Sequence, residues 1–330
     1  MSLMVNQIIN GECIAEMKKI TDNSIDLIIA DPPYNLSKGG AWKYEHNADL
    51  KGMGGNWNKV MQDWDDYSFE AYMVFTREWL IEARRILKPT GSMWIFGTYH
   101  NIGIINVICQ MIGIEIINEV IWYKKNAFPN LAGRRLTASH ETILWCNKGA
   151  KKREYYFNYE YSKTGDFSYD TLKSPGKQMR TVWDISNNKE KEELAYGRHP
   201  TQKPIRILKR MIDLSSRPGD IMLTPFSGAG SECVAAKITG RKYIGIEMEE
   251  EYCRVAKARL EHVTVSKEYG IQRITIPELP KQQNRISADE ASLKSEKALV
   301  ANPKPKNKKS KHAEADNAQI TMDSLLGGAL

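Results

Sequence analysis

The chain has 330 residues, 42% of them hydrophobic, which is enough to bury one large core or two smaller ones. Its formal charge of +7 permits a polyanionic partner without identifying one, because a mild surplus of Lys and Arg is common on solvated surfaces. The apolar stretch 102–122 is interrupted by polar residues such as Asn106 and Glu115, which excludes a membrane span, and the first residues lack the pattern of a secretory signal.

The cysteines stand far apart and are odd in number, with no CxxC pair for zinc or redox chemistry. This usage is typical of a reduced, cytoplasmic protein, so we expect most of the thiols in the core. The five are Cys13, Cys109, Cys146, Cys233 and Cys253.

Apolar runs alternate with amphipathic stretches along most of the chain. The first block predicts a strand at 24–30, a helix at 67–87, a strand at 91–97, a helix at 101–112 and a strand at 116–123. The second block predicts a helix at 205–215, a strand at 221–226, a helix at 232–238, a strand at 243–248 and a helix at 250–260. Such alternation predicts an α/β fold with a parallel sheet covered by helices.

Basic and aromatic residues interleave between the two blocks, at about 148–198, where helical periodicity is weak. With the preceding segment 124–140, this region favours a DNA-binding surface over its alternative, a solvated loop. The residues expected to contact DNA are Lys124, Arg134, Arg135, Lys177 and Arg180.

Three further segments lie outside the alternating blocks. The glycine-rich stretch 39–60 reads either as a mobile loop near the substrate or as disorder. The Pro- and Lys-rich run 302–312 is predicted to be disordered, with its lysines adding at most nonspecific attraction to phosphates. The final residues 320–330 could fold on a partner.

A glycine turn, Phe226–Gly230, follows the predicted strand 221–226, and Glu247 ends the next strand. Glycines let the backbone approach a ligand, and an acid in this place can accept hydrogen bonds from two ribose hydroxyls. The layout indicates a nucleoside site, although it is neither GxGxxG nor GxxxxGK[ST]. The alternative is a tight turn beside a surface glutamate.

The sequence LIIADPPYNL ends the first strand abruptly. Pro32 and Pro33 remove two N–H donors, so the carbonyls there and the Asp31 carboxylate form a wall of hydrogen-bond acceptors at the carboxyl end of the strand. Tyr34 adds a flat ring face. This suits a planar ring carrying an amino group, whereas the alternative is that the prolines merely end the strand and Asp31 caps the next segment.

These motifs, with GRHPTQKP at 197–204 between them, resemble the β-group amino-methyltransferases that act on DNA. The catalytic motif comes first, the target-recognition region second and the cofactor glycines last, and the resemblance covers about 7–260. It implies a permuted, doubly wound sheet of seven strands, one of them antiparallel, and S-adenosylmethionine as methyl donor. It divides the chain into a catalytic half at 1–147, a target-recognition region at 148–198, a cofactor half at 199–262 and a partly disordered extension at 263–330.

Positions carried over from the resemblance add candidate cofactor residues. Glu247 would bind the ribose, and Lys203 would neutralise a carboxylate at the methionine end, while His199 reads as a positioning residue rather than a base. The full set is Glu12, Cys13, Asp31, Thr201, Gln202, Lys203, Thr224, Phe226, Ser227, Gly228, Gly230, Ser231 and Glu247.

Thr224 is a departure, because the family usually has Asp there, and Ala229 replaces its usual Ser or Thr. A hydroxyl can accept a hydrogen bond from the cofactor's ammonium but brings no charge, which predicts weaker or differently arranged cofactor binding.

Asp31 rather than Ser resembles the adenine-N6 branch of the family. The expected mechanism holds the amino group of a flipped adenine between Asp31 and the Pro32 carbonyl, with Tyr34 stacked on the base, and requires no metal. The resemblance also implies DNA as partner, a possible homodimer and a possible cognate restriction endonuclease. The alternatives are cytosine-N4 transfer, methylation of another planar amino nitrogen in RNA, and a DNA-binding module with a degenerate cofactor site.

Overall fold

The computed structural model describes residues 3–34, 67–127, 134–149, 153–164, 176–187, 189, 191–197, 199, 201–265 and 274–275. All of them belong to one compact unit, Met1–Thr275. The predictions for 39–60, 302–312 and 320–330 lie outside the described residues.

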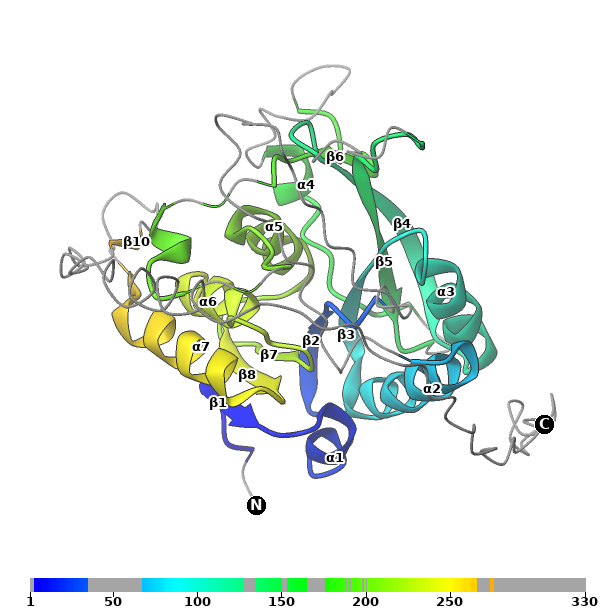
Figure 1. The fold of residues 1–330 in the computed structure, drawn as a ribbon, viewed down its shortest axis with the longest axis horizontal. Helices are drawn as coiled ribbons and strands as arrows, with labels where there is room; N and C mark the ends of the chain where they lie inside the picture. The colour runs from blue at the N-terminus through cyan, green and yellow to red at the C-terminus, as the bar shows by residue number, and fades with distance from the viewer. Residues whose placement is uncertain are drawn as a thin grey trace, which may run out of the picture. The chain divides into compact units, whose positions relative to one another are not determined.

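One mixed sheet of eight strands organises the unit (Figure 1). In spatial order the strands are β1 (Gln7–Asn10), β8 (Lys242–Glu247), β7 (Ile221–Thr224), β2 (Ile25–Ala30), β3 (Leu87–Gly97), β5 (His140–Asn147), β4 (Glu115–Tyr123) and β6 (Val182–Asp184). Strand β5 runs antiparallel to both of its neighbours, and every other pair in this sheet is parallel. The predicted α/β class and its single antiparallel strand are confirmed.

The predicted count of seven strands is wrong for this chain, because β6 adds an eighth at the edge beside β4. It comes from the segment in which the sequence showed no regular pattern. Three residues are too short for an alternation to be recognised, and β6 is fixed instead by Trp183, which is buried and donates its indole N–H to the Arg180 carbonyl at 2.9 Å. Residues 182–184 of the segment 148–198 therefore extend the sheet.

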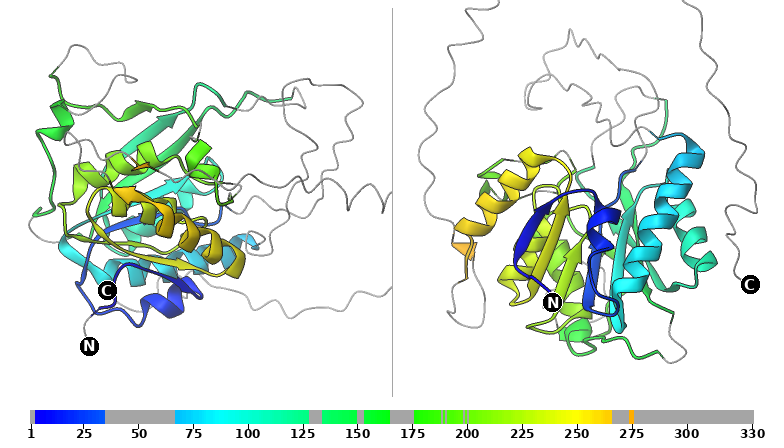
Figure 2. Two further views of the ribbon diagram at one scale, coloured as in Figure 1. Left: turned by 90° about the vertical axis from the view of Figure 1, so that its left-hand side faces the viewer. Right: turned by 90° about the horizontal axis from the view of Figure 1, so that it is seen from below.

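Helices cover both faces of the sheet (Figure 2). One face carries α1 (Cys13–Met17), α2 (Phe69–Ile86) and α3 (Ile102–Met111). The other carries α5 (Ile205–Ser215), α6 (Ser231–Ile238) and α7 (Glu250–His262). The smaller elements are α4 (Tyr161–Thr164), a 3₁₀ turn at Lys191–Leu194, β9 (Thr264–Val265) and β10 (Ile274–Thr275).

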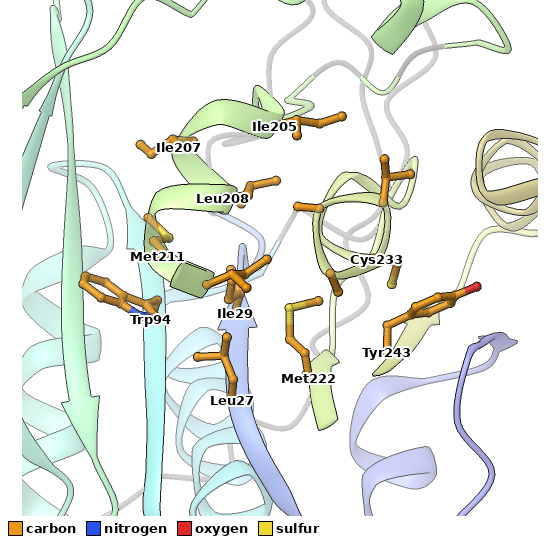
Figure 3. Packing of buried hydrophobic residues seen from close by; sticks show 14 of the residues in the cluster. Leu27, Ile29, Trp94, Ile205, Ile207, Leu208, Met211, Met222, Cys233 and Tyr243 are labelled. Carbon is orange, nitrogen blue, oxygen red and sulfur yellow. The ribbon is translucent and has the colours of Figure 1, made fainter. Parts of the chain in front are cut away.

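Successive side chains of β2 point to opposite faces of the sheet, and both faces are buried under helices. Leu27 and Ile29 pack under α5 and α6, whereas Ile28 and Ala30 belong to the cluster under α1 and α2. Figure 3 shows the first of these cores, where Met211 of α5 lies near Leu27, Ile29 and Trp94. All five cysteines are buried and free, as expected from their spacing.

The crossover after β2 leads to α2 on one face, and the turn after β7 leads to α6 on the other. Strands β2 and β7 are neighbours, so the connections diverge between their carboxyl ends. In open α/β sheets this switch point is where ligands bind. The motifs at 31–34 and 225–230 follow directly from these two strands.

The aromatic residues at 153–161 correct the sequence interpretation. Tyr155, Phe157 and Tyr161 pack against the core, with the first two contacting Trp145 at ring-centroid distances of 5.6 and 5.5 Å. Two others do not join this core: Tyr159 is 52% exposed, and the Tyr156 ring lies under the Arg217 guanidinium, 3.9 Å from its centre. The neighbouring basic residues indicated a DNA surface, but these rings instead give apolar cover to the face of the sheet at β5, between β3 and β4.

No helix among the described residues is both long and apolar enough to cross a membrane. The apolar stretch 102–122 forms α3 and most of β4.

Candidate active site

A cavity lies at the switch point and joins the two motifs that are far apart in sequence. It is lined by Asp31–Tyr34 after β2, by Pro225–Ala229 after β7 and by Ile246–Met248 at the end of β8. All four predicted catalytic residues line it, as do most of the predicted cofactor residues, namely Glu12, Cys13, Asp31, Thr201, Gln202, Lys203, Phe226, Ser227, Gly228, Ser231 and Glu247.

Thr224 and Gly230 do not line the cavity. Thr224 ends β7 with 0% exposure, and its hydroxyl oxygen is buried without a hydrogen-bond partner among the described residues. Gly230 has φ +73°, and a Cβ there would meet the Ala256 Cβ of α7 at 2.7 Å. This glycine permits close packing of two helices rather than approach to a ligand.

Glu247 and Gly228 form the nucleoside-type part of the cavity. The Glu247 carboxylate accepts the Gly228 N–H at 2.7 Å and the Glu249 N–H at 2.9 Å. Burial raises the pKa of Glu247, and these two N–H donors oppose the rise. Each oxygen keeps a second acceptor site for a ligand hydroxyl.

Strand β1 brings Glu12 and Cys13 beside Glu247, because Asn10 pairs with Glu247 in the sheet. Glu12 is also the N-cap of α1, where its carboxylate accepts the N–H groups of Ile14 and Ala15 at 2.9 and 2.7 Å. These bonds help to lower its pKa against the effect of burial. Glu12 therefore caps α1, and its contact with the cofactor stays a prediction.

An aromatic group closes one wall of the cavity. Phe226 contacts Trp79 edge-on at 5.4 Å and Phe75 at 6.1 Å between ring centroids. Phe75 in turn stacks on Tyr67 at 5.3 Å, and both of these rings line the cavity. The motif identified Phe226 alone, because the other rings come from α2 and the residues before it.

Asp31 lies in a buried ion pair at the other part of the cavity. Lys203 donates to Asp31 Oδ2 at 2.5 Å, and the Tyr34 hydroxyl donates to Oδ1 at 2.5 Å. Burial raises the pKa of Asp31, and the Lys203 charge opposes that rise. The carboxylate predicted to be neutralised by Lys203 belonged to the cofactor, whereas in the structure the ammonium pairs with Asp31.

Lys203 is almost fully buried, at 3% exposure, and meets a second carboxylate. Its Nζ lies 3.8 Å from Glu141 Oε2, and Glu141 Oε1 is 2.8 Å from Lys124 Nζ. The attraction of Asp31 and Glu141 raises the pKa of Lys203 against burial, and Lys203 and Lys124 lower that of Glu141. The sequence analysis missed Glu141, which sits on β5 and has no local motif.

His199 packs beside the glycine turn. Its Nδ1 accepts the Thr201 N–H at 3.3 Å and lies 3.1 Å from the Thr201 hydroxyl, while its ring contacts Tyr252 edge-on at 4.4 Å. Burial lowers its pKa to about 4, so the imidazole is neutral near pH 7 and a weak base. These contacts agree with a positioning role.

Glu232 is another cavity residue absent from the predicted set. It occupies the first turn of α6, is 4% exposed and lines the cavity. The signal available in the sequence SECVAAKI was a single acid among small and apolar helix residues.

The predicted DNA-contacting residues fall into two groups. Lys124 is held by Glu141, its side chain is 13% exposed, and its ammonium lies 5.1 Å from the centre of the Trp122 ring. The other four are exposed, and Arg135 donates to the Tyr99 hydroxyl. They are Arg134, Arg135, Lys177 and Arg180. Lys124 therefore belongs to the buried ion network, and the exposed residues stay predicted phosphate or base contacts.

The amino-acid sequence is similar to those of known DNA methyltransferases. The sequence model of a family described as DNA methylase matches residues 25–258. Type II methyltransferase M2.LlaDCHI of Lactococcus lactis subsp. cremoris is 42% identical over 255 residues, which cover 77% of this chain and 88% of the relative. Type II methyltransferase M2.DpnII of Streptococcus pneumoniae is 40% identical over 256 residues, covering 77% and 89%.

Solved structures share the fold at lower identity. A complex of M1.HpyAVI with SAM has a TM-score of 0.53 and 24% identity, covering 77% of this chain and 98% of that one. The cytosine-N4-specific PvuII DNA methyltransferase has a TM-score of 0.57 and 17% identity, covering 76% and 85%. These similarities support the doubly wound architecture.

Proposed function

The chain belongs to the DNA methylase family, and from that premise we propose that it transfers a methyl group from S-adenosylmethionine to the N6 amino group of an adenine in DNA. The observation that carries the proposal is one cavity lined by both the acceptor wall at Asp31 and Pro32 and the nucleoside-type acid Glu247. A DNA-binding module without activity has no use for this combination.

Several features of the cavity fit the methyl donor. Glu247 offers two carboxylate oxygens for ribose hydroxyls, and Gly228 presents its backbone without a side chain at φ +48°. The wall around Phe226 gives an apolar surface for a flat purine. S-adenosylmethionine, when bound, supplies an electrophilic methyl group on a sulfonium.

Asp31 would hold the amino group that receives the methyl. The lone pair of an adenine amino nitrogen is delocalised into the ring, so hydrogen bonds from its N–H groups to Asp31 and the Pro32 carbonyl favour the pyramidal geometry needed for attack. These bonds strengthen as positive charge develops on nitrogen. An ionised carboxylate has about four acceptor sites, so Asp31 can keep Lys203 and Tyr34 and still bind the base.

Lys203 would keep Asp31 ionised in a site whose burial favours the neutral acid. Tyr34, with its hydroxyl held by Asp31, would present its ring to the base. In duplex DNA the base must first leave the stack, which costs a few kcal/mol that stacking on Tyr34 partly offsets.

We further propose a setting for this activity from the resemblance and the names of the relatives. The enzyme would modify DNA in the cytoplasm, at the nucleoid, and protect a sequence that a cognate restriction endonuclease cuts. Methylated and unmethylated DNA challenged with candidate endonucleases would test that pairing. A homodimer is part of the same proposal. Sedimentation of the full chain at the mass of a dimer would support it, and sedimentation at the mass of a monomer would contradict it.

Transfer of label from S-adenosylmethionine to DNA tests the main proposal. Purified full-length protein would be incubated with methyl-labelled donor and mixed-sequence DNA, and the DNA then digested to nucleosides. Label in N6-methyl-2′-deoxyadenosine is the expected result. Label in N4-methyl-2′-deoxycytidine would identify the other branch of the family. Unlabelled DNA, with label transferred to RNA in a parallel reaction, would refute DNA as substrate.

A further inference from the structure

Glu232 is a buried acid that the mechanism above does not use. It lines the same cavity as Asp31, Lys203 and Glu247 and is 4% exposed. It belongs to α6, which is otherwise made of small and apolar residues with one lysine in its last turn. A carboxylate buried in such surroundings is costly unless a cation meets it.

The other carboxylates of the cavity already have partners. Asp31 is bound by Lys203 and Tyr34, Glu247 by two backbone N–H groups, and Glu12 by the first turn of α1. For Glu232, the hydrogen bond recorded among the described residues comes from its own N–H. Glu232 is thus the cavity carboxylate with the most unused acceptor capacity.

The charges around Glu232 come from three other elements. Asp31 follows β2 and repels it, while Lys203 before α5 and Arg259 of α7 attract it. Lys203 is paired with Asp31. Arg259 donates through Nη1 to the Ala229 carbonyl and the Ser231 hydroxyl, and its Nη2 has no hydrogen-bond partner among the described residues. Burial, the largest influence, raises the pKa of Glu232 to about 7. A cationic ligand group would therefore find a carboxylate that gains from pairing.

We propose that Glu232 binds the α-ammonium group at the methionine end of the methyl donor. The inference rests on the proposed donor, S-adenosylmethionine, whose adenosine end is assigned to Glu247 and the glycine turn. The resemblance led us to expect this contact from Thr224, but its hydroxyl is buried and Thr224 does not line the cavity, whereas Glu232, eight residues later, does. The negative charge that an Asp at position 224 would bring to the ammonium group is supplied instead by Glu232 of α6.

A binding experiment with three nucleosides isolates this contact. S-adenosylmethionine carries both an ammonium and a sulfonium, S-adenosylhomocysteine carries the ammonium alone, and 5′-methylthioadenosine carries neither. Glu232→Gln should weaken the first two by about 10- to 100-fold, as expected for loss of a charged hydrogen bond, and leave the third unchanged. Unchanged 5′-methylthioadenosine binding also shows that the variant is folded. Glu250→Gln, at an exposed acid that starts α7, is the matched control and should leave all three affinities unchanged.

The pH dependence gives a second readout. Because the ionised form of Glu232 is the binding form, wild-type affinity for S-adenosylhomocysteine should rise between pH 6 and pH 8, and calorimetry in two buffers of different ionisation enthalpy should detect proton release. Asp31 and Glu247 also have raised pKa values, so the same titration of Glu232→Gln separates their contribution. The variant should show a flatter profile and less proton release.

Three results would overturn the inference. Equal weakening of all three ligands would mean a structural role for Glu232, and weakening of S-adenosylmethionine alone would mean a contact with the sulfonium. Wild-type protein that binds none of the three would refute the proposed donor itself, which is a failure distinct from the other two.

Discussion

The two ends of the cavity are built in different ways. At the nucleoside-type end, Gly228 and Glu247 are joined through a backbone N–H, and both come from one short β7–α6–β8 segment. At the Asp31 end, the contacts are ion pairs between side chains from distant parts of the chain, since Lys203 lies 172 residues after Asp31. Local backbone geometry shapes the first end, and buried charge shapes the second.

This difference predicts different responses to mutation. Hydrogen bonds from backbone N–H groups and a positive φ hold the glycine turn at any pH near neutrality. A network of Asp31, Lys203, Glu141 and Lys124 depends on every member keeping its charge, because an unpaired buried charge is costly. Changes at the Asp31 end should therefore depend strongly on pH, and changes at the glycine turn should not.

Lys203→Met gives the largest expected effect on stability. Removing the ammonium leaves Asp31 buried without its cation, so at pH 8 the free energy of unfolding should fall by about 3–5 kcal/mol. The folded-state pKa of Asp31, already raised by burial, would rise further above its unfolded value. Stability is then lost as pH increases through the acid range and regained below it, where Asp31 is protonated in both states.

Urea unfolding of wild type and variant between pH 4.5 and pH 8 would measure this dependence. Lys209→Met is the matched control, because the 46% exposed Lys209 pairs with Asp213 on the surface of α5 and should contribute less than about 1 kcal/mol. A loss for Lys203→Met that is the same at every pH would contradict the buried-charge account.

Gly230→Ala probes the backbone-built end. Its Cβ would lie 2.7 Å from the Ala256 Cβ at a φ of +73°, so overpacking and backbone strain should together cost about 1–3 kcal/mol, independent of pH. Gly219→Ala is the control, since Gly219 also has a positive φ, +90°, but faces open space. Thermal unfolding would compare the two, and equal losses would show that contact with α7 contributes nothing.

Arg180→Ala and Lys124→Met separate the exposed from the buried basic residues, with the smallest expected effects. Removing one phosphate contact at Arg180 should reduce the slope of log binding constant against log salt by about 1. Lys124 is tied to Glu141, so its replacement should leave that slope unchanged and lower methyl transfer instead. Fluorescence anisotropy of labelled DNA across a salt series would measure both slopes, and a reduced slope for Lys124→Met would place that residue on the phosphates.

What the sequence could predict follows from the same contrast. The turn at 226–230 and the wall at 31–34 are each contiguous and each follow a predicted strand, which was enough to place both at the carboxyl ends of strands. That these two strands are neighbours is seen only in the structure. The pairing of Lys203 with Asp31 and the nearby Glu141 depend on tertiary structure, which no local pattern encodes. Tyr155 and Phe157 read as DNA-facing because their basic neighbours masked the apolar face that covers Trp145.

Comparison of the single variants Asp31→Asn and Glu232→Gln tests the central claim, that one carboxylate acts on the base and another holds the donor. Both variants would be assayed for S-adenosylhomocysteine affinity and for single-turnover methyl transfer at saturating donor. Asp31→Asn should slow transfer by about 10²–10³-fold with affinity changed little, and Glu232→Gln should lose affinity with transfer changed little. Equal losses of affinity and rate in both variants would contradict the division of roles.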